Sequence, residues 1–243
     1  MKPSIRRSLR PVMTHNNGTS WQLGEYVPPE PLWWDIPTLP RRDIVDVWTF
    51  DADNGVELVG EVNGLTWQII EGGPSIHPGQ GFNFGGAGLA AVTLPAGLST
   101  PELSFVMQYD NGVRNGTLDA FLSWYDTETD NIIYTLQNNF DSNLVRWSCG
   151  GADATTIEMS RTGLETGIYG ASGERFYFDG EFKNAGDPGT GGAIPEGKDF
   201  YLGAIRLGDG RTKQYVKARI KKLIIVRRKL TDEEQWELYF RIQ

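Results

Sequence analysis

The chain has 243 residues and a formal net charge of −8, and its 30 glycines, 13 prolines and 8 tryptophans favour strands and turns over helices. The single cysteine, Cys149, excludes an intramolecular disulfide and therefore a disulfide-stapled secreted scaffold. No apolar run approaches the length of about 20 residues that crosses a bilayer, and the N-terminus lacks the core of a signal peptide. We expect an all-β protein that is made in a cytoplasm, is not exported by a signal peptide and has no membrane partner.

Charge is distributed unevenly along the sequence. Residues 46–210 carry 7 basic and 23 acidic side chains, a net of −16, whereas residues 1–45 carry 6 basic against 4 acidic and residues 211–243 carry 10 against 4. An acidic body repels phosphates, so we expect no nucleic-acid partner. The basic ends favour either contact with an acidic protein surface or, near the C-terminus, a solvated strand face.

Residues 1–44 differ in composition from the rest of the chain. They hold seven of the 13 prolines, so we expect an extended segment with no ladder or helix of any length. The segment also carries aromatic side chains that a flexible linker lacks. We predict an anchoring arm that docks on its own domain or on a neighbouring subunit; a disordered leader with a local aromatic cluster is the alternative. The predicted anchoring residues are Arg6, Arg7, Arg10, Trp21, Trp33 and Trp34.

Residues 45–243 are predicted to form one sandwich domain. Apolar or alternating runs recur at intervals of about 8 to 12 residues between turn residues, which is typical of a β-sandwich or jelly roll. Four tryptophans and the cysteine fall in such runs and are predicted to be core: Trp48, Trp67, Trp124, Trp147 and Cys149. The predicted strands cover residues 44–50, 58–61, 65–70, 90–94, 103–109, 118–125, 131–136, 144–149, 155–159, 167–170, 175–178, 181–183 and 200–207.

The acidic loop at residues 126–130 is the strongest catalytic candidate in the sequence. In an extended backbone Asp126, Glu128 and Asp130 point to one side at steps of about 7 Å, and carboxylates roughly 5 to 10 Å apart perform glycoside hydrolysis. The loop lies between two predicted strands, which favours a solvated hairpin tip instead. The same oxygens, or those of residues 51–54, could hold a calcium ion, although neither cluster matches an EF-hand loop.

Other catalytic and modification signals are weak. His15 and His77 are the only histidines, which excludes a multi-histidine zinc site and leaves a serine or cysteine nucleophile without an obvious base. No P-loop motif occurs. The sequences Asn17-Gly-Thr19 and Asn115-Gly-Thr117 match the glycosylation sequon, and without a signal peptide we interpret both as coincidence.

Residues 214–226 contain the clearest strand pattern. Val216, Ala218 and Ile220 alternate with basic residues, which predicts a strand with one buried and one wet face. The apolar run at residues 223–226 is predicted to be buried on both faces.

A short helix is predicted directly after this strand. Thr231, with Glu234 three residues on, forms a capping box, which satisfies two otherwise unpaired backbone N–H groups. Trp236, Tyr239 and Phe240 then follow at helical spacing, so we expect their rings to press the helix onto the sheet.

Four motifs occur in the order found in a known superfamily. They are Trp48-Thr-Phe-Asp51 at the end of the first strand, Tyr177-Phe-Asp-Gly180 in a hairpin with a primed-type Asp-Gly turn, Tyr201-Leu-Gly-Ala204, and Arg228-Lys-Leu-Thr-Asp-Glu-Glu234 before the helix. With them, residues 45–243 resemble the concanavalin A-like lectin/glucanase superfamily, particularly its LamG-like jelly rolls. The resemblance implies an all-β, two-sheet antiparallel jelly-roll sandwich with a short C-terminal helix.

The resemblance also implies a function. The hydrolases of the superfamily carry an E-x-D-x-x-E strand, which is missing here, so we predict that the protein is not an enzyme. A LamG-like domain behind a basic, proline-rich aromatic arm resembles accessory structural proteins of tailed bacteriophages. We therefore predict a structural or attachment protein located in a phage virion, as a capsid decoration, head fibre or tail-associated component. Its arm would bind other capsid or tail proteins and copies of itself.

Two alternatives stay open at this point. One is a carbohydrate-binding module that recognises a cell-surface glycan through an exposed tryptophan or the loop at residues 126–130. The other is a glycoside hydrolase that uses Asp126 and Glu128.

Overall fold

The computed structural model describes most of the chain: residues 12–15, 21–24, 32–51, 58–99, 102–126, 131–139, 141, 144–149, 155–160, 166–185, 193–194 and 197–243. Contacts divide the chain into two units, Met1–Leu32 and Trp33–Gln243. The second unit thus begins earlier than the domain boundary predicted after residue 44. No helix in the described ranges is long and apolar enough to cross a membrane.

The first unit contains a short antiparallel ladder. Strand β1 (Val12–His15) pairs with β2 (Trp21–Gly24), and His15 lies opposite Trp21. The prediction that the arm forms no ladder was wrong. The prolines of the arm flank this hairpin and none lies between residues 12 and 24, so no backbone donor is missing from it. The predicted anchors Arg6, Arg7 and Arg10 lie outside the described residues.

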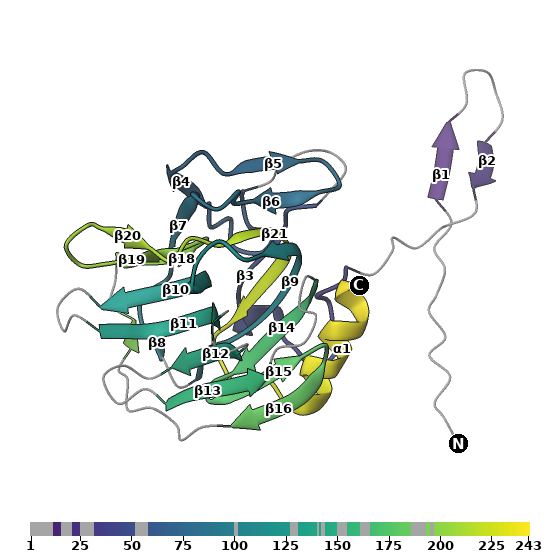
Figure 1. Ribbon diagram of the computed structural model, residues 1–243. Helices are drawn as coiled ribbons and strands as arrows, with labels where there is room; N and C mark the ends of the chain where they lie inside the picture. The colour runs from purple at the N-terminus through teal and green to yellow at the C-terminus, as the bar shows by residue number, and fades with distance from the viewer. Residues whose placement is uncertain are drawn as a thin grey trace. The chain divides into compact units, whose positions relative to one another are not determined.

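The second unit is a two-sheet antiparallel β-sandwich with one C-terminal helix, which confirms the predicted fold class (Figure 1). One sheet has seven strands in the order β13 (Thr155–Ser160), β12 (Leu144–Cys149), β11 (Asn131–Asn139), β10 (Leu118–Asp126), β18 (Asp199–Leu202), β7 (Leu89–Thr93) and β4 (Gln68–Glu71). The other has eight: β16 (Glu181–Ala185), β15 (Arg175–Phe178), β14 (Gly167–Ser172), β9 (Ser104–Val113), β21 (Lys217–Val226), β6 (Gly81–Asn83) and β5 (Ser75–His77), with β3 (Ile44–Thr49) also paired to β21. Two short pairs join β17 (Ala193–Ile194) to β8 (Leu98–Ser99) and β19 (Ile205–Arg206) to β20 (Thr212–Lys213).

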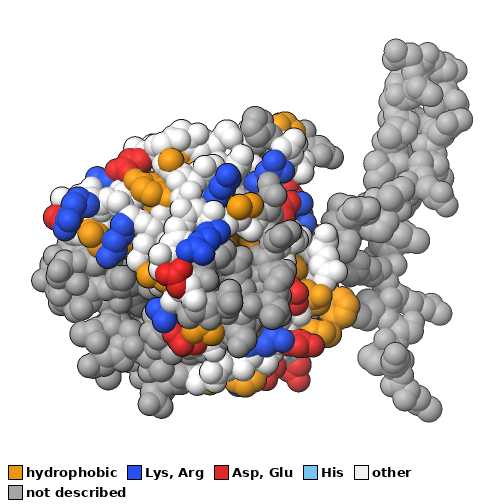
Figure 2. Space-filling model, in the orientation of Figure 1, with side chains coloured by type: hydrophobic (Ala, Val, Ile, Leu, Met, Phe, Trp, Pro, Cys, Tyr) orange, Lys and Arg blue, Asp and Glu red, His pale blue; other side chains and the backbone are white. Residues whose placement is uncertain are grey.

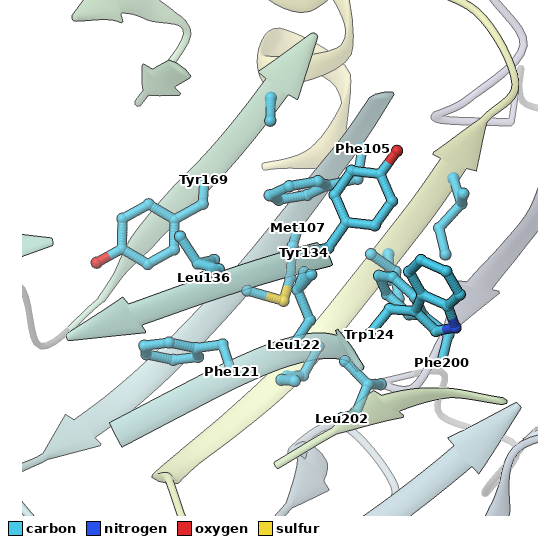
Figure 3. Close-up of a cluster of buried hydrophobic side chains, with 14 of the residues drawn as sticks. Phe105, Met107, Phe121, Leu122, Trp124, Tyr134, Leu136, Tyr169, Phe200 and Leu202 are labelled. Carbon is cyan, nitrogen blue, oxygen red and sulfur yellow. The ribbon is translucent and has the colours of Figure 1, made fainter. Parts of the chain in front are cut away.

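The main core lies between the two sheets. Alternate residues of each strand point inward, and the two inner faces interdigitate. Figure 3 shows Phe105, Met107 and Tyr169 from the eight-stranded sheet beside Phe121 and Tyr134 from the other. All four tryptophans predicted to be core are buried, as is Cys149, so these predictions are confirmed. Burial raises the pKa of the Cys149 thiol to about 11, as expected of an unreactive core cysteine.

A second apolar core covers the outer face of the eight-stranded sheet. The residues from Trp33 to Ile44 and the helix α1 (Asp232–Ile242) both pack on this face. Its buried members are Trp34, Ile36, Leu39, Ile44, Val47, Val106, Ile168, Ile224, Val226, Leu230, Leu238 and Ile242. Leu223 and Ile225 of β21 belong to the main core and Ile224 and Val226 to this one, which confirms that the strand is buried on both faces.

Several predicted details of the sandwich are confirmed and others are not. The Asp179-Gly180 turn joins β15 to β16 with φ values of 49° and 77°, the primed geometry predicted. The strand predicted at residues 200–207 is interrupted, because Gly203 has φ +94 and a Cβ there would come within 2.1 Å of the Phe84 ring. Strands β5 and β6 form in a glycine-rich stretch where no strand was predicted.

The closing helix forms as predicted, and Tyr239 packs against the second core as predicted, but the prediction was wrong for Trp236 and Phe240. The capping box is present: the Thr231 hydroxyl accepts from the Glu234 N–H at 3.2 Å, and the Glu234 carboxylate accepts from the Thr231 N–H at 3.0 Å. The buried positions of α1 are Glu234, Gln235, Leu238 and Ile242. At about 100° per residue, the positions two before and two after Leu238 lie on the far side of the helix. Trp236 and Phe240 occupy these two positions and are exposed.

Candidate functional site

A pocket of about 380 Å³ opens at the end of the sandwich where β10 begins. It is formed by the loop between β9 and β10 and by the two residues that follow β20. The lining residues are Asn115, Gly116, Thr117, Leu118, Asp119, Gln214 and Tyr215. Its volume lies within the range of about 300–1,000 Å³ that is typical of small-molecule sites.

Asn115 ties the two walls of the pocket together. Its side-chain amide donates to the carbonyl of Tyr215 at 2.9 Å and to the carbonyl of Gly86 at 2.8 Å, and its backbone N–H donates to Asp119 Oδ2 at 2.9 Å. A Cβ at Gly86 would come within 2.6 Å of Asn115 Oδ1, so a larger residue there would displace the amide. These bonds occupy both donors of the Asn115 amide and hold the loop in place.

Gln214 is held in a left-handed backbone conformation at the opposite wall. Its φ is 59°, and φ is positive at only one other described residue that is not glycine, Asp179. Its carbonyl accepts from the Ala120 N–H at 2.8 Å, and its Oε1 accepts from Gln137 Nε2 at 2.7 Å. Left-handed residues other than glycine cost of order 1 kcal/mol and concentrate at functional sites. The backbone conformation of Gln214 therefore supports this pocket as the candidate functional site.

Tyr215 connects the pocket to an ionic cluster beside it. Its hydroxyl donates to Glu71 Oε2 at 2.9 Å, the other Glu71 oxygen accepts from Arg206, and Arg206 Nη1 donates to Thr212 Oγ1 at 2.8 Å. The hydrogen bond from Tyr215, with help from Thr212 and Arg206, lowers the pKa of Glu71 despite partial burial. Burial and the Glu71 carboxylate raise the pKa of Tyr215. The Tyr215 side chain is therefore uncharged at physiological pH, and its hydrogen bond to Glu71 fixes its orientation at the pocket wall.

The chemistry of the pocket fits a neutral, hydroxyl-rich ligand. Its walls carry the Thr117 hydroxyl and the Asn115 and Gln214 amides, of which the Asn115 N–H donors and the Gln214 oxygen already bond within the protein, and Asp119 beneath them is 1% exposed. Amides and hydroxyls donate and accept hydrogen bonds, as sugar hydroxyls do. None of the described lining residues is Lys or Arg, so the wall offers no cation for a phosphate.

The pocket is not at the acidic loop that the sequence singled out. Asp126 ends β10 opposite Asn131 of β11, which confirms the predicted hairpin, and the pocket lies at the other end of β10. The side chain of Asp126 and the residues Glu128 and Asp130 lie outside the part of the chain that the structure describes. Among the described residues no group of three or more His, Cys, Asp or Glu could hold a metal ion.

Trp33 and Trp34, predicted as anchors, pack on their own domain. Trp34 is 4% exposed and its indole N–H donates to Glu61 Oε2 at 2.7 Å. The Trp33 indole N–H donates to Thr49 Oγ1 at 3.1 Å, and that hydroxyl donates in turn to Glu61. Of the two docking alternatives, the structure shows the first for these two residues. The side chain of Trp21 lies outside the described part.

The basic residues near the C-terminus are largely paired within the domain. Lys221 Nζ lies 3.0 Å from Asp110, Lys229 Nζ lies 2.5 Å from Glu174, and Arg228 contacts both Asp43 and Glu234 at 2.7 to 2.9 Å. These pairs leave less free positive charge for a partner than the sequence implied, although Lys217 is exposed.

Almost no sequence pattern points to the pocket. Asn115-Gly-Thr117 was noted only as a glycosylation sequon, and its amide is now seen to make structural hydrogen bonds. Gln214 and Tyr215 stood in no motif. A turn glycine after an asparagine at the end of a strand was the only local hint.

Comparisons with known proteins show the class of fold. No family model and no curated protein matches the chain. Solved structures match over more than four fifths of the chain, at 10 to 16% identity, which shows a shared β-sandwich fold alone.

Three of these structures illustrate the match. Domain 4 of the extracellular arabinanase of Geobacillus stearothermophilus, in complex with arabinotriose, has a TM-score of 0.62 and 16% identity, over 81% of this chain and 98% of that one. The receptor-binding domain of a botulinum neurotoxin C/D mosaic has a TM-score of 0.60 and 10% identity, over 83% of this chain and 52% of that one. Trypanosoma rangeli sialidase has a TM-score of 0.56 and 15% identity, over 84% of this chain and 34% of that one. The chain thus spans about half of the toxin domain, and the three structures carry no link to phages.

Proposed function

We propose that the chain is a non-catalytic carbohydrate-binding module and that the pocket between the β9–β10 loop and Gln214-Tyr215 holds the glycan. The observation that carries the proposal is the pocket itself, a shallow, open hollow lined by amide and hydroxyl groups, with no cationic lining among the described residues. The arabinotriose complex of the arabinanase domain and a sialylated complex of a botulinum toxin binding domain support a glycan ligand on this fold.

Pre-organisation supports binding by this pocket. The Asn115 hydrogen bonds and the strained Gln214 backbone fix the walls before a ligand arrives, which reduces the ordering cost of binding. Sugars exchange their bonds to water for bonds to protein at little net gain, so an ordered site is needed for useful affinity.

A glycan array probed with the full chain, followed by calorimetry with arabinotriose, a sialylated oligosaccharide or the best array hit, tests the proposal. The informative variant is Gln214→Gly, because glycine accepts the positive φ while the amide is removed. We expect about tenfold weaker binding, the loss of roughly one hydrogen bond.

The matched control is Asp179→Gly, the same kind of change at the other described left-handed residue that is not glycine. Asp179 lies in the β15–β16 turn, outside the pocket, so glycan affinity should not change. Equal loss in both variants, or no glycan bound by the wild type, would refute the proposal.

The absence of catalysis is part of the proposal. It is supported by the missing E-x-D-x-x-E strand and by the position of the pocket at the opposite end of β10 from Asp126. Incubating the chain with array hits and analysing products by mass spectrometry tests it. Hydrolysis that is lost in both Asp126→Asn and Glu128→Gln would identify a glycosidase instead.

We propose, second, that residues 1–32 attach the module to a larger particle such as a phage virion. The division of the chain into separate units at Trp33, with a basic, proline-rich first unit, supports this role. The deletion that tests it removes residues 1–31, because Trp34, Ile36 and Leu39 are part of the core of the body. The truncated chain should still fold and bind glycan but should no longer join its assembly.

A further inference from the structure

The helix α1 exposes an aromatic surface that the pocket and the proposed glycan do not use. Trp236 is 43% exposed and Phe240 is 59% exposed, the largest exposed fraction among the large hydrophobic residues described. Figure 2 shows hydrophobic side chains, in orange, gathered over α1 at the right-hand side of the body. Aromatic residues exposed together on a helix mark interaction sites more often than isolated ones do.

The surface is held rigidly. A Cβ at Gly180, in the β15–β16 turn, would come within 2.6 Å of Trp236 and 2.8 Å of Tyr239, so the missing side chain lets the helix lie directly on the turn. Glu234 and Gln235 fix the rotation of the helix from the other side, by bonds to Arg228 and to the Ala171 carbonyl. The exposure of Trp236 and Phe240 is thus built into the packing.

The arrangement of the rings does not favour a sugar. Tyr239 stacks on Trp236 at 28° with centroids 5.4 Å apart, and Phe240 stands at 84° to Trp236 at 4.9 Å. A pyranose ring needs a flat, open aromatic face, whereas rings set at steep angles form an uneven surface. Such a surface fits another set of side chains, because protein interfaces interlock aromatic knobs with pockets.

The charges at the two ends of α1 favour an antiparallel pair of helices. The first turn exposes the acidic Asp232 and Glu233, and the last turn carries the basic Arg241, which also pairs with Glu237 of the same helix at 2.8 Å. When two copies of such a helix lie antiparallel, the acidic turn of each lies beside the basic turn of the other. The two helix dipoles then point in opposite directions, which is also favourable. A parallel arrangement would place like charges together. A two-fold axis through the middle of the helix brings Trp236 of one copy to Phe240 of the other.

We propose that α1 is a self-association surface, on which a second copy of this chain docks its own α1 in antiparallel orientation. The proposal is independent of the glycan pocket, which lies in other elements. A dimer would present two pockets at once, which raises avidity for a surface that carries many glycans.

Sedimentation equilibrium of the full chain tests the proposal. We expect a reversible dimer, and about 30-fold or greater weakening in Phe240→Glu and in Trp236→Glu, which is typical of central interface aromatics. Ile69→Glu is the control, because Ile69 is 46% exposed on β4 and does not belong to α1. It should dimerise like the wild type, and far-UV circular dichroism should show that all three variants are folded.

Charge reversal tests the antiparallel orientation. Glu233→Arg alone and Arg241→Glu alone should each dimerise more weakly than the wild type, and an equimolar mixture should recover the wild-type constant, because both contacts of the mixed dimer are then of opposite charge. A wild type that stays monomeric at high concentration overturns the proposal. So does an oligomer that Phe240→Glu leaves intact, because the copies would then meet elsewhere.

Discussion

Residues 33–44 and helix α1 cover the same outer face of the eight-stranded sheet, yet they place their tryptophans in opposite environments. Trp34 is 4% exposed and Trp236 is 43% exposed. From the sequence, the first was predicted to dock on a neighbouring subunit or on its own domain, and the second was predicted to press the helix onto the sheet. The two regions are also joined, because Arg241 Nη1 of α1 donates to the Asp35 carbonyl at 3.0 Å.

The difference lies in where the polar groups find partners. Trp34 can be buried because Glu61 accepts its indole N–H. In α1 two polar residues turn inward beside Leu238 and Ile242, because Glu234 bonds to the Arg228 guanidinium and Gln235 donates to the Ala171 carbonyl at 3.0 Å. Partner availability, and not hydrophobicity alone, thus decides which face of each segment is buried.

The largest effect that can test this comparison is the loss of Trp34. Trp34→Ala removes a buried indole and leaves Glu61 Oε2 without the donor that the indole supplies, and we expect a destabilisation of about 3–5 kcal/mol. Trp236→Ala removes as large a ring from an exposed site and should change the free energy of unfolding by only about 0.5 kcal/mol. Urea denaturation at low protein concentration measures both.

Trp34→Phe separates the hydrogen bond from the packing in this first prediction. It keeps most of the apolar volume and loses the N–H, so it should fall between the wild type and Trp34→Ala. Equal costs for Trp34→Ala and Trp236→Ala would contradict the contrast between the two regions.

The next largest effect concerns Arg228, which links both regions. Its guanidinium contacts Asp43 at the end of the first region and both oxygens of Glu234 in α1. Arg228→Met leaves Glu234, 4% exposed, with its charge uncompensated. We expect a cost of about 2–3 kcal/mol, less than for a fully buried pair because the Arg228 side chain is 31% exposed. Thermal unfolding followed by circular dichroism measures it.

The same pair predicts a pH dependence. Burial alone would raise the pKa of Glu234, but the hydrogen bonds from Arg228 and the Thr231 N–H lower it by more, so it stays below its ordinary value of 4.5. A lowered folded-state pKa stabilises the fold above the ordinary value, and this contribution is lost as the pH falls through the folded-state pKa. The stability difference between the wild type and Glu234→Gln should therefore shrink as the pH falls below the ordinary value and through the folded-state pKa of Glu234. A constant difference would show that Glu234 is not held ionised by Arg228.

The strand pattern and the capping box could be predicted from the sequence, because each depends only on residues that are close together along the chain. Alternation in residues 216–221 fixes the faces of β21, and Thr231 with Glu234 fixes the start of α1. The rotation of α1 about its own axis, which decides the stripe of side chains that faces the sheet, could not be predicted. Trp236, Tyr239 and Phe240 have the spacing of a helix stripe, but so do Glu234, Leu238 and Ile242. The choice between the two stripes depends on distant partners, Arg228 for Glu234 and the Ala171 carbonyl for Gln235.

The candidate site was hidden for a different reason. Asn115 and Tyr215 are 100 residues apart, and their contact exists only because β10 and the segment before β21 come together in the fold. The left-handed φ of Gln214 follows from that contact and not from the residue type, since glutamine has no preference for this conformation. The sequence could therefore predict the sandwich but not the residues that line its pocket.

The smallest predicted effect concerns the helix cap, and it sharpens the account of α1. Thr231→Ala removes the hydroxyl that accepts from the Glu234 N–H and should cost about 1 kcal/mol, whereas Thr231→Ser keeps an acceptor and should cost little. Because the cap also holds Glu234 toward Arg228, Thr231→Ala should cost less in a background that already carries Arg228→Met. A double-mutant cycle by urea denaturation measures this coupling. Full additivity would mean that the cap and the ion pair act separately, and that the rotation of α1 is set by Gln235 and Leu238 alone.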